Sequence, residues 1–161
     1  MAGMPTLPAH PLELKVPPPV VALLCGLLAW WLAHVLPGWR FDFPGRLPVA
    51  AALVSAGLAL DLSALVGFHR ARTTFNPLAP QRTSAIVRGG PYRFTRNPMY
   101  LGLACSLTGL AAWLAHPLAL AAPVAFVAWV TRFQIVPEER ALLAAFGAPY
   151  ADYLRSVRRW L

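Results

Sequence analysis

The sequence predicts an all-α integral membrane protein, a helical bundle with about four transmembrane helices followed by amphipathic cytoplasmic helices. Of the 161 residues 58% are hydrophobic and only 12% are charged, whereas average soluble domains carry about one quarter charged residues. The mean hydropathy is +0.55, and the apolar residues form long runs that prolines and glycines separate. We therefore expect a proline-rich N-terminal segment (1–18), without the features of a cleaved signal peptide, and one membrane domain (19–161).

The first two apolar runs predict transmembrane helices over 19–36 and 47–68. The first run contains no charged residue apart from a protonatable His34, and a Pro-Gly turn ends it. The second run contains Asp61. An acid inside a membrane span faces protein or a water-filled cavity, so Asp61 is either a functional group or a polar contact between helices.

The next two apolar runs predict shorter helices over 98–115 and 118–136. The corner at residues 116–117 is too short for anything but a tight antiparallel hairpin. A new amphipathic segment then begins at Pro137, since proline and the acids after it are favoured in the first turn of a helix. We expect Gly147 to end that helix. The remainder of 137–161 mixes aromatic and basic residues, which predicts a cytoplasmic interfacial helix.

The charges predict the orientation of the chain. The formal net charge is +8, and all Lys and Arg residues except Arg40 and Arg46 lie on the side of both termini and of the polar loop 69–97. The positive-inside rule then places both termini in the cytoplasm and the protein in the inner (cytoplasmic) membrane. Anionic membrane lipids account for this basic face, so we expect no nucleic-acid partner. We also expect no metal site, and Cys25 and Cys105 are interpreted as packing residues.

The segment from Gly89 to Gly102 connects the polar loop to the third apolar run. Its two prolines predict an extended or turning connection, and a helix can begin at Pro98 with Asn97 at the N-cap position. Aromatic and arginine side chains crowd this segment (Tyr92, Arg93, Phe94, Arg96, Tyr100). Composition alone favours an interfacial belt that anchors a membrane helix, and the alternative is a segment that lines a ligand.

The motif Gly-Pro-Tyr-Arg-Phe-Thr-Arg-Asn-Pro-Met-Tyr-Leu-Gly (90–102), with Glu138, Glu139, Phe146-Gly147 and two later tyrosines, resembles the isoprenylcysteine carboxyl methyltransferase family. That family is similar to the phospholipid N-methyltransferases, and the resemblance covers about residues 72–161. It implies a helical membrane bundle that binds S-adenosyl-L-methionine at its cytoplasmic end. The cofactor-binding residues that the resemblance implies are Ser84, Ala85, Ile86, Val87, Tyr92, Asn97, Pro98, Met99, Tyr100 and Glu138.

Two positions depart from the family pattern. Asn97 stands where the family usually has histidine, and Gln134 stands where an arginine that holds the carboxylate of the acceptor is expected. Arg132 is the nearest cation and is predicted as the catalytic residue that binds the acceptor, because a guanidinium pairs with carboxylate or phosphate through two hydrogen bonds. The alternative for Arg132 is an arginine whose charge reaches the membrane surface.

The resemblance implies methyl transfer from S-adenosylmethionine to a lipophilic acceptor that enters from the bilayer. A prenylcysteine-type carboxylate and another small lipid nucleophile are both possible acceptors. Two alternatives stay open from the sequence. One is an NADPH-dependent membrane reductase related to sterol reductases, in which the arginine-rich loop binds the phosphate of the cofactor. The other is a non-catalytic membrane scaffold, which the departures at Asn97 and Gln134 would favour.

Overall fold

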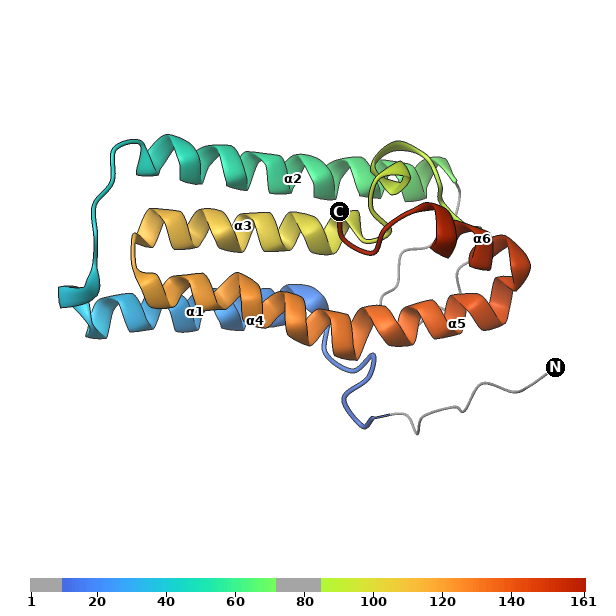
Figure 1. Ribbon diagram of the computed structural model, residues 1–161, viewed down its shortest axis with the longest axis horizontal. Coiled ribbons are helices and arrows are strands. Elements are labelled where there is room, and N and C mark those ends of the chain that lie inside the picture. The colour runs from blue at the N-terminus through green and yellow to red at the C-terminus, as the bar shows by residue number, and fades with distance from the viewer. Residues whose placement is uncertain (1–9, 72–84) are drawn as a thin grey trace.

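The computed structural model describes residues 10–71 and 85–161, and the described chain is helical, as predicted (Figure 1). Short 3-10 turns at Pro37–Trp39, Gly90–Arg93 and Pro117–Leu120 precede or connect the helices, and a π turn spans Thr131–Ile135. The helices are α1 (Pro18–Val35), α2 (Arg46–Arg70), α3 (Pro98–Leu114), α4 (Ala121–Val130), α5 (Val136–Phe146) and α6 (Ala148–Ser156).

Three helical stretches of the described chain are long and apolar enough to cross a membrane. They are Pro18–Val35, Arg46–Arg70 and the 30-residue run Pro117–Phe146. The α3 helix is also apolar but has only 17 residues, fewer than the approximately 20 that a typical span needs. The structure thus supports three of the four predicted spans by length, and the crossing of α3 stays a prediction.

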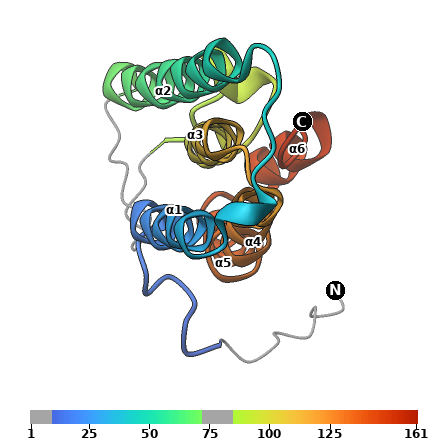
Figure 2. The ribbon, with the colours of Figure 1, turned by 90° about the vertical axis from the view of Figure 1, so that its left-hand side faces the viewer.

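The α3 helix lies at the centre of the bundle, between α2 on one side and α1 with α4 on the other (Figure 2). Glycines bring α2 and α3 into close contact. A Cβ atom on Gly102 would lie 2.2 Å from Asp61 Oδ1 and 2.7 Å from the Gly57 carbonyl oxygen, and one on Gly57 would lie 2.5 Å from the Gly102 carbonyl. Small residues permit this approach of two backbones, which is the usual way that helices pack tightly in membranes.

On its opposite side α3 packs against α1 and α4 in an apolar core. The α1 helix contributes small buried residues, among them Ala22, Ala29 and Ala33. Leu107 of α3 and Phe126 of α4 join them, and the phenylalanine is fully buried. The hairpin predicted between the last two apolar runs is present, since Ala115 and His116 turn the chain between α3 and the 3-10 turn before α4.

The predicted helix break at Pro137 is wrong. Proline lacks an N–H group and its ring clashes with the carbonyl four residues before it, so a proline inside a helix normally kinks or ends it. Here the helix widens into the π turn, in which the Val136 N–H donates to the carbonyl of Thr131, five residues back. The run therefore continues through Pro137 to Phe146, where Gly147, with φ of 58°, ends it as predicted.

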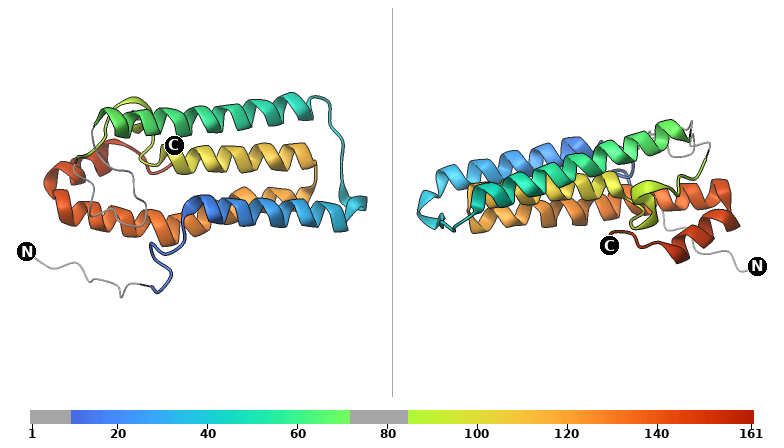
Figure 3. Two further views of the ribbon diagram at one scale, coloured as in Figure 1. Left: turned by 180° about the vertical axis from the view of Figure 1, so that it is seen from behind. Right: turned by 90° about the horizontal axis from the view of Figure 1, so that it is seen from above.

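The C-terminal interfacial helix is also different from the prediction. The α6 helix ends at Ser156, and its aromatic residues Tyr150 and Tyr153 are buried at 5% exposure each. After α6 the chain runs beside the segment from Gly89 to Gly102 (the motif segment), where the Arg96 N–H donates to the Arg158 carbonyl at 2.9 Å. Figure 3 shows α5, α6 and the motif segment together at one end of the bundle, opposite the α1–α2 connection.

Candidate functional site

A tyrosine, a glutamine and a glutamate meet at the end of the bundle where α3 begins. The Tyr100 hydroxyl donates to Glu138 Oε1 at 2.6 Å, and Gln134 Nε2 donates to the same oxygen at 2.7 Å. Tyr100 is 4% exposed and Gln134 is fully buried. Among the described residues, none donates to the second carboxylate oxygen, Oε2. Glu138 is thus held by one oxygen and can accept hydrogen bonds from a ligand with the other.

Local backbone chemistry places these three residues. Pro98 begins α3, as predicted, because its fixed φ suits the first helical position. Tyr100 follows within the first turn. On the other side of the cluster, Gln134 and Glu138 are four residues apart in the continuous helical run, and residues at that spacing are neighbours on a helix surface.

The second acid, Glu139, joins the motif segment to the C-terminal residues. Its Oε1 accepts from Arg96 Nη2 at 2.8 Å, and its Oε2 accepts from Arg159 Nη2 at 2.6 Å. Arg96 also donates through Nη1 to the carbonyls of Leu154 and Val157 at 2.8 and 2.6 Å. The Arg96 and Glu139 side chains are only 10% and 13% exposed. This buried ion pair fixes the motif segment against α5 and the residues after α6.

Asn97 has a different role from the predicted helix cap. It occupies the N-cap position of α3 but its side chain makes no capping hydrogen bond. Its Nδ2 instead donates to the Arg159 carbonyl at 2.9 Å, and the buried Thr95 hydroxyl donates to the same carbonyl at 3.2 Å. An amide at position 97 therefore secures the C-terminal residues in this chain.

Tyr153 of α6 also contacts the motif segment, through Tyr92. The Tyr153 hydroxyl donates to the Tyr92 carbonyl at 2.8 Å, and the Tyr92 ring meets Phe68 edge-on, with 5.5 Å between the ring centroids. Burial is the main cause that raises the pKa of Tyr153, to about 12, and the pKa of Tyr92 is raised further by burial and by its acidic neighbours. Both phenols are therefore neutral at physiological pH and act as apolar walls with one polar end.

The remaining predicted cofactor residues lie around this cluster. Ser84 lies outside the described residues. Ala85, Ile86 and Val87 are partly buried, and Val87 Cγ1 lies 3.5 Å from where a Cβ atom on Gly67 of α2 would be. Pro98 is buried and Met99 is partly buried at the start of α3. The structure thus brings Tyr92, Asn97 and Tyr100 together with Glu138 at one end of the bundle.

Arg132 is engaged away from this cluster. Its Nη1 lies 2.7 Å from Glu13 Oε1, its guanidinium carbon lies 5.3 Å from the centre of the Phe133 ring, and its side chain is 51% exposed. It makes no hydrogen bond with Glu138. Gln134, a departure from the family pattern, is the residue that reaches Glu138. The four-residue spacing of Gln134 and Glu138 signals this contact once the helix is continued through Pro137.

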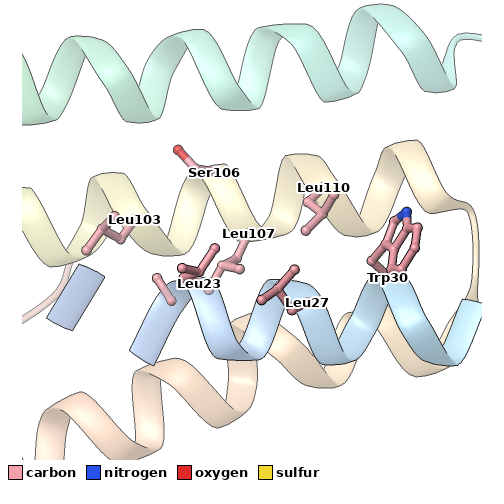
Figure 4. Close-up of a pocket in the computed structure, with 9 residues that line it drawn as sticks. Leu23, Leu27, Trp30, Leu103, Ser106, Leu107 and Leu110 are labelled. Carbon is pink, nitrogen blue, oxygen red and sulfur yellow. The ribbon is translucent and has the colours of Figure 1, made fainter. Parts of the chain in front are cut away.

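An apolar groove of about 360 Å³ lies between α1 and α3 (Figure 4). Two residues that line it, Leu23 and Leu27 of α1, are 61% and 53% exposed, so the groove is open at the side of the bundle. It begins at Leu103, three residues after Tyr100. Its lining is Ala22, Leu23, Gly26, Leu27, Trp30, Leu103, Ser106, Leu107 and Leu110.

Asp61 lies on the other side of α3 from the groove, in the tight α2–α3 contact. Its Oδ1 is buried against Gly102 and has no hydrogen-bond partner among the described residues. Gly102 and Tyr100 are two positions apart and so point to nearly opposite sides of the helix. Asp61 therefore does not belong to the Glu138 cluster.

Together, the fold and this cluster define an all-helical protein with apolar helices of membrane-spanning length and a buried carboxylate site at one end. Residues 46–149, more than half of the chain, match the family model described as phospholipid methyltransferase. The chain belongs to the phospholipid methyltransferase family, which is a family of enzymes. It is also similar to an uncharacterized protein of Haemophilus influenzae, with 40% identity over 63 residues that cover 39% of this chain and all of that protein.

Proposed function

We propose that the protein transfers a methyl group from S-adenosylmethionine to a phospholipid acceptor at the cytoplasmic face of the membrane. The observation that carries this proposal is the Tyr100–Gln134–Glu138 cluster, which lies beside the family motif and next to an open apolar groove. Family membership supports methyl transfer and a lipid acceptor. The proposal includes a crossing of the membrane by all four apolar helices, with both termini in the cytoplasm.

The site residues fit this cofactor chemically. S-adenosylmethionine carries an ammonium group and ribose hydroxyls, all of which are donors, and Glu138 Oε2 is an acceptor without a donor among the described residues. Charge-assisted hydrogen bonds of this kind are stronger than neutral ones. The faces of Tyr92 and Tyr100 suit a sulfonium cation, because aromatic rings attract cations. Ala85, Ile86, Val87, Asn97, Pro98 and Met99 complete the proposed cofactor wall, and Ser84 keeps the role that the family resemblance implies.

The bound cofactor supplies an already activated methyl group, so the protein mainly has to align the acceptor and exclude water. Tyr100 and Gln134 hold Glu138 in one orientation from two different helices. The groove between α1 and α3 takes the acyl chain of the acceptor, because its lining is apolar and its opening lies among candidate membrane spans. Its end at Leu103 brings the headgroup toward Tyr100. Arg132 remains a proposed contact for the acceptor, because its bond to Glu13 involves only Nη1 and its side chain is 51% exposed.

Replacement of Glu138 by glutamine tests the cofactor site. Isothermal titration of detergent-purified protein with S-adenosylhomocysteine is expected to show saturable binding that Glu138→Gln weakens about 10- to 100-fold, because hydrogen bonds to charged groups contribute about 1.5–3 kcal/mol. Asp152→Asn is the matched control, since Asp152 is an exposed acid on α6. A parallel titration with NADPH tests the reductase alternative. Binding of NADPH alone, or of neither compound by a folded protein, contradicts the proposal.

Replacement of Gly26 by leucine tests the groove. A Cβ atom at Gly26 lies 3.2 Å from Leu110 Cδ2, so a leucine there fills the groove. We expect the KM for phosphatidylethanolamine in mixed micelles to rise about tenfold, which corresponds to the loss of about two buried methylene groups. Binding of S-adenosylhomocysteine stays unchanged. Gly38→Leu is the control, because nothing lies within 4 Å of a Cβ atom there. An unchanged KM in Gly26→Leu assigns the acyl chain elsewhere.

A further inference from the structure

The segment His10–Pro17, which precedes α1, lies against the π turn and crosses the junction of α4 and α5 (Figure 1). Its contacts come from main chain and side chains alike. The Leu14 N–H donates to the Phe133 carbonyl at 3.0 Å, and the ring centroids of His10 and Phe133 are 5.1 Å apart. Val16 packs against the apolar core. Every one of these contacts is remote in sequence, so none of them follows from local propensity.

The main-chain contact supplies a donor that the helix itself lacks. In an uninterrupted α-helix the Phe133 carbonyl accepts from the N–H of residue 137, but Pro137 has no N–H. The Leu14 N–H takes that place. Leu14 has φ of 56°, a left-handed conformation that is unfavourable for a branched residue and persists only where the surroundings impose it. Its strain indicates that the position of this N–H is determined by the contact with the π turn.

Glu13 supplies the second part of the contact. Its carboxylate pairs with Arg132, which lies inside the π turn, and with Arg140 of α5. The Glu13 side chain is only 6% exposed, whereas the two arginines are 51% and 44% exposed. A single carboxylate thus bridges two helical segments on either side of Pro137 and fixes their relative rotation.

We propose that His10–Pro17 is a strap that holds the π turn in register, and that Glu13 is a positioning residue for Gln134 and Glu138. The inference rests on the proposed cofactor role of Glu138. The π turn shifts the phase of the helix between Thr131 and Val136, and Gln134 lies inside it. If the strap is released, the turn relaxes, and the Gln134–Glu138 hydrogen bond loses its geometry although neither residue contacts Glu13.

The test combines amide hydrogen exchange of the protein without ligand with titration by S-adenosylhomocysteine. Glu13→Gln is expected to speed exchange in residues 131–140 and to weaken binding about five- to tenfold, the lower range of coupling between separate sites. Asp152→Asn, which removes an exposed acid paired with Arg155, should change neither quantity. The full charge exchange, Glu13→Arg with Arg132→Glu and Arg140→Glu, should restore both, because Glu13 pairs with both arginines. Leu14→Gly keeps the N–H and adopts the positive φ without strain, so it should change neither quantity.

Three results would overturn the strap. The first is an unchanged rate of amide hydrogen exchange in residues 131–140 of Glu13→Gln. The second is faster amide exchange throughout the bundle in that variant. The third is weaker binding of S-adenosylhomocysteine that reversal of the charges does not restore. Acceleration throughout would mean a general stability effect instead of positioning. If the wild-type protein does not bind S-adenosylhomocysteine, the proposed function fails, and the exchange data alone then confirm or overturn the strap.

Discussion

Replacement of Arg96 by methionine is expected to destabilise the protein by about 3–5 kcal/mol, the usual effect of removing one partner from a buried ion pair. Methionine keeps much of the apolar stem, so the loss comes from the guanidinium. Without it, the carbonyls of Leu154 and Val157 lose their donors and Glu139 keeps only Arg159. Unmet buried acceptors are costly because they have given up water without compensation.

A denaturant titration in detergent, followed by circular dichroism, measures this effect. The matched control is Arg155→Met, because Arg155 is an exposed arginine, 74% accessible, in an ion pair with Asp152. Exposed ion pairs contribute about 0–1 kcal/mol, so the control should unfold close to the wild type. Equal behaviour of the two variants would contradict the role of Arg96 in joining the motif segment to the C-terminal residues.

Replacement of Gly102 by valine is expected to separate α2 from α3 and to destabilise the bundle by about 3 kcal/mol, the upper range for overpacking. The added Cβ atom meets Asp61 Oδ1 at 2.2 Å and the Gly57 carbonyl oxygen at 2.7 Å. The second contact is with backbone, which cannot move without displacing the helix. The same titration measures the loss, with Gly38→Val as the control in open space.

A second substitution separates the two contacts. Asp61→Ala in the Gly102→Val background removes the nearer atom but leaves the Gly57 carbonyl, so we expect only partial recovery of stability. Full recovery would mean that the carboxylate, and not the approach of the two backbones, sets the distance between α2 and α3.

Helix limits that depend on local signals were predictable. The apolar runs, with Pro-Gly turns and Pro98, place α1, α2 and α3 within two residues of the observed limits. The prediction failed at Pro137, because a proline followed by two acids has the composition of a helix start. The N–H that compensates for it comes from Leu14, which is more than one hundred residues away in sequence. Sequence patterns do not contain that information.

The residues of the candidate site were likewise predictable only in part. The family motif indicated Tyr92, Asn97, Tyr100 and Glu138, and the structure brings them to one end of the bundle. Gln134 was overlooked as a site residue because the predicted break at Pro137 removed its helical relation to Glu138. The predicted interfacial helix at the C-terminal end did not include the burial of Tyr153, because the hydrogen-bond partner of Tyr153 is the Tyr92 carbonyl, 61 residues earlier.

The π turn has a consequence for how this chain compares with its relatives. A hydrogen bond that spans five residues instead of four accommodates one residue more than an α-helix of the same rise. The direction in which Glu138 points therefore depends on the residue that the π turn adds before it. We expect relatives without a proline at position 137 to lack one residue between 131 and 135. Alignments that force equal length across this region will pair Gln134 and Arg132 with the wrong positions of those chains.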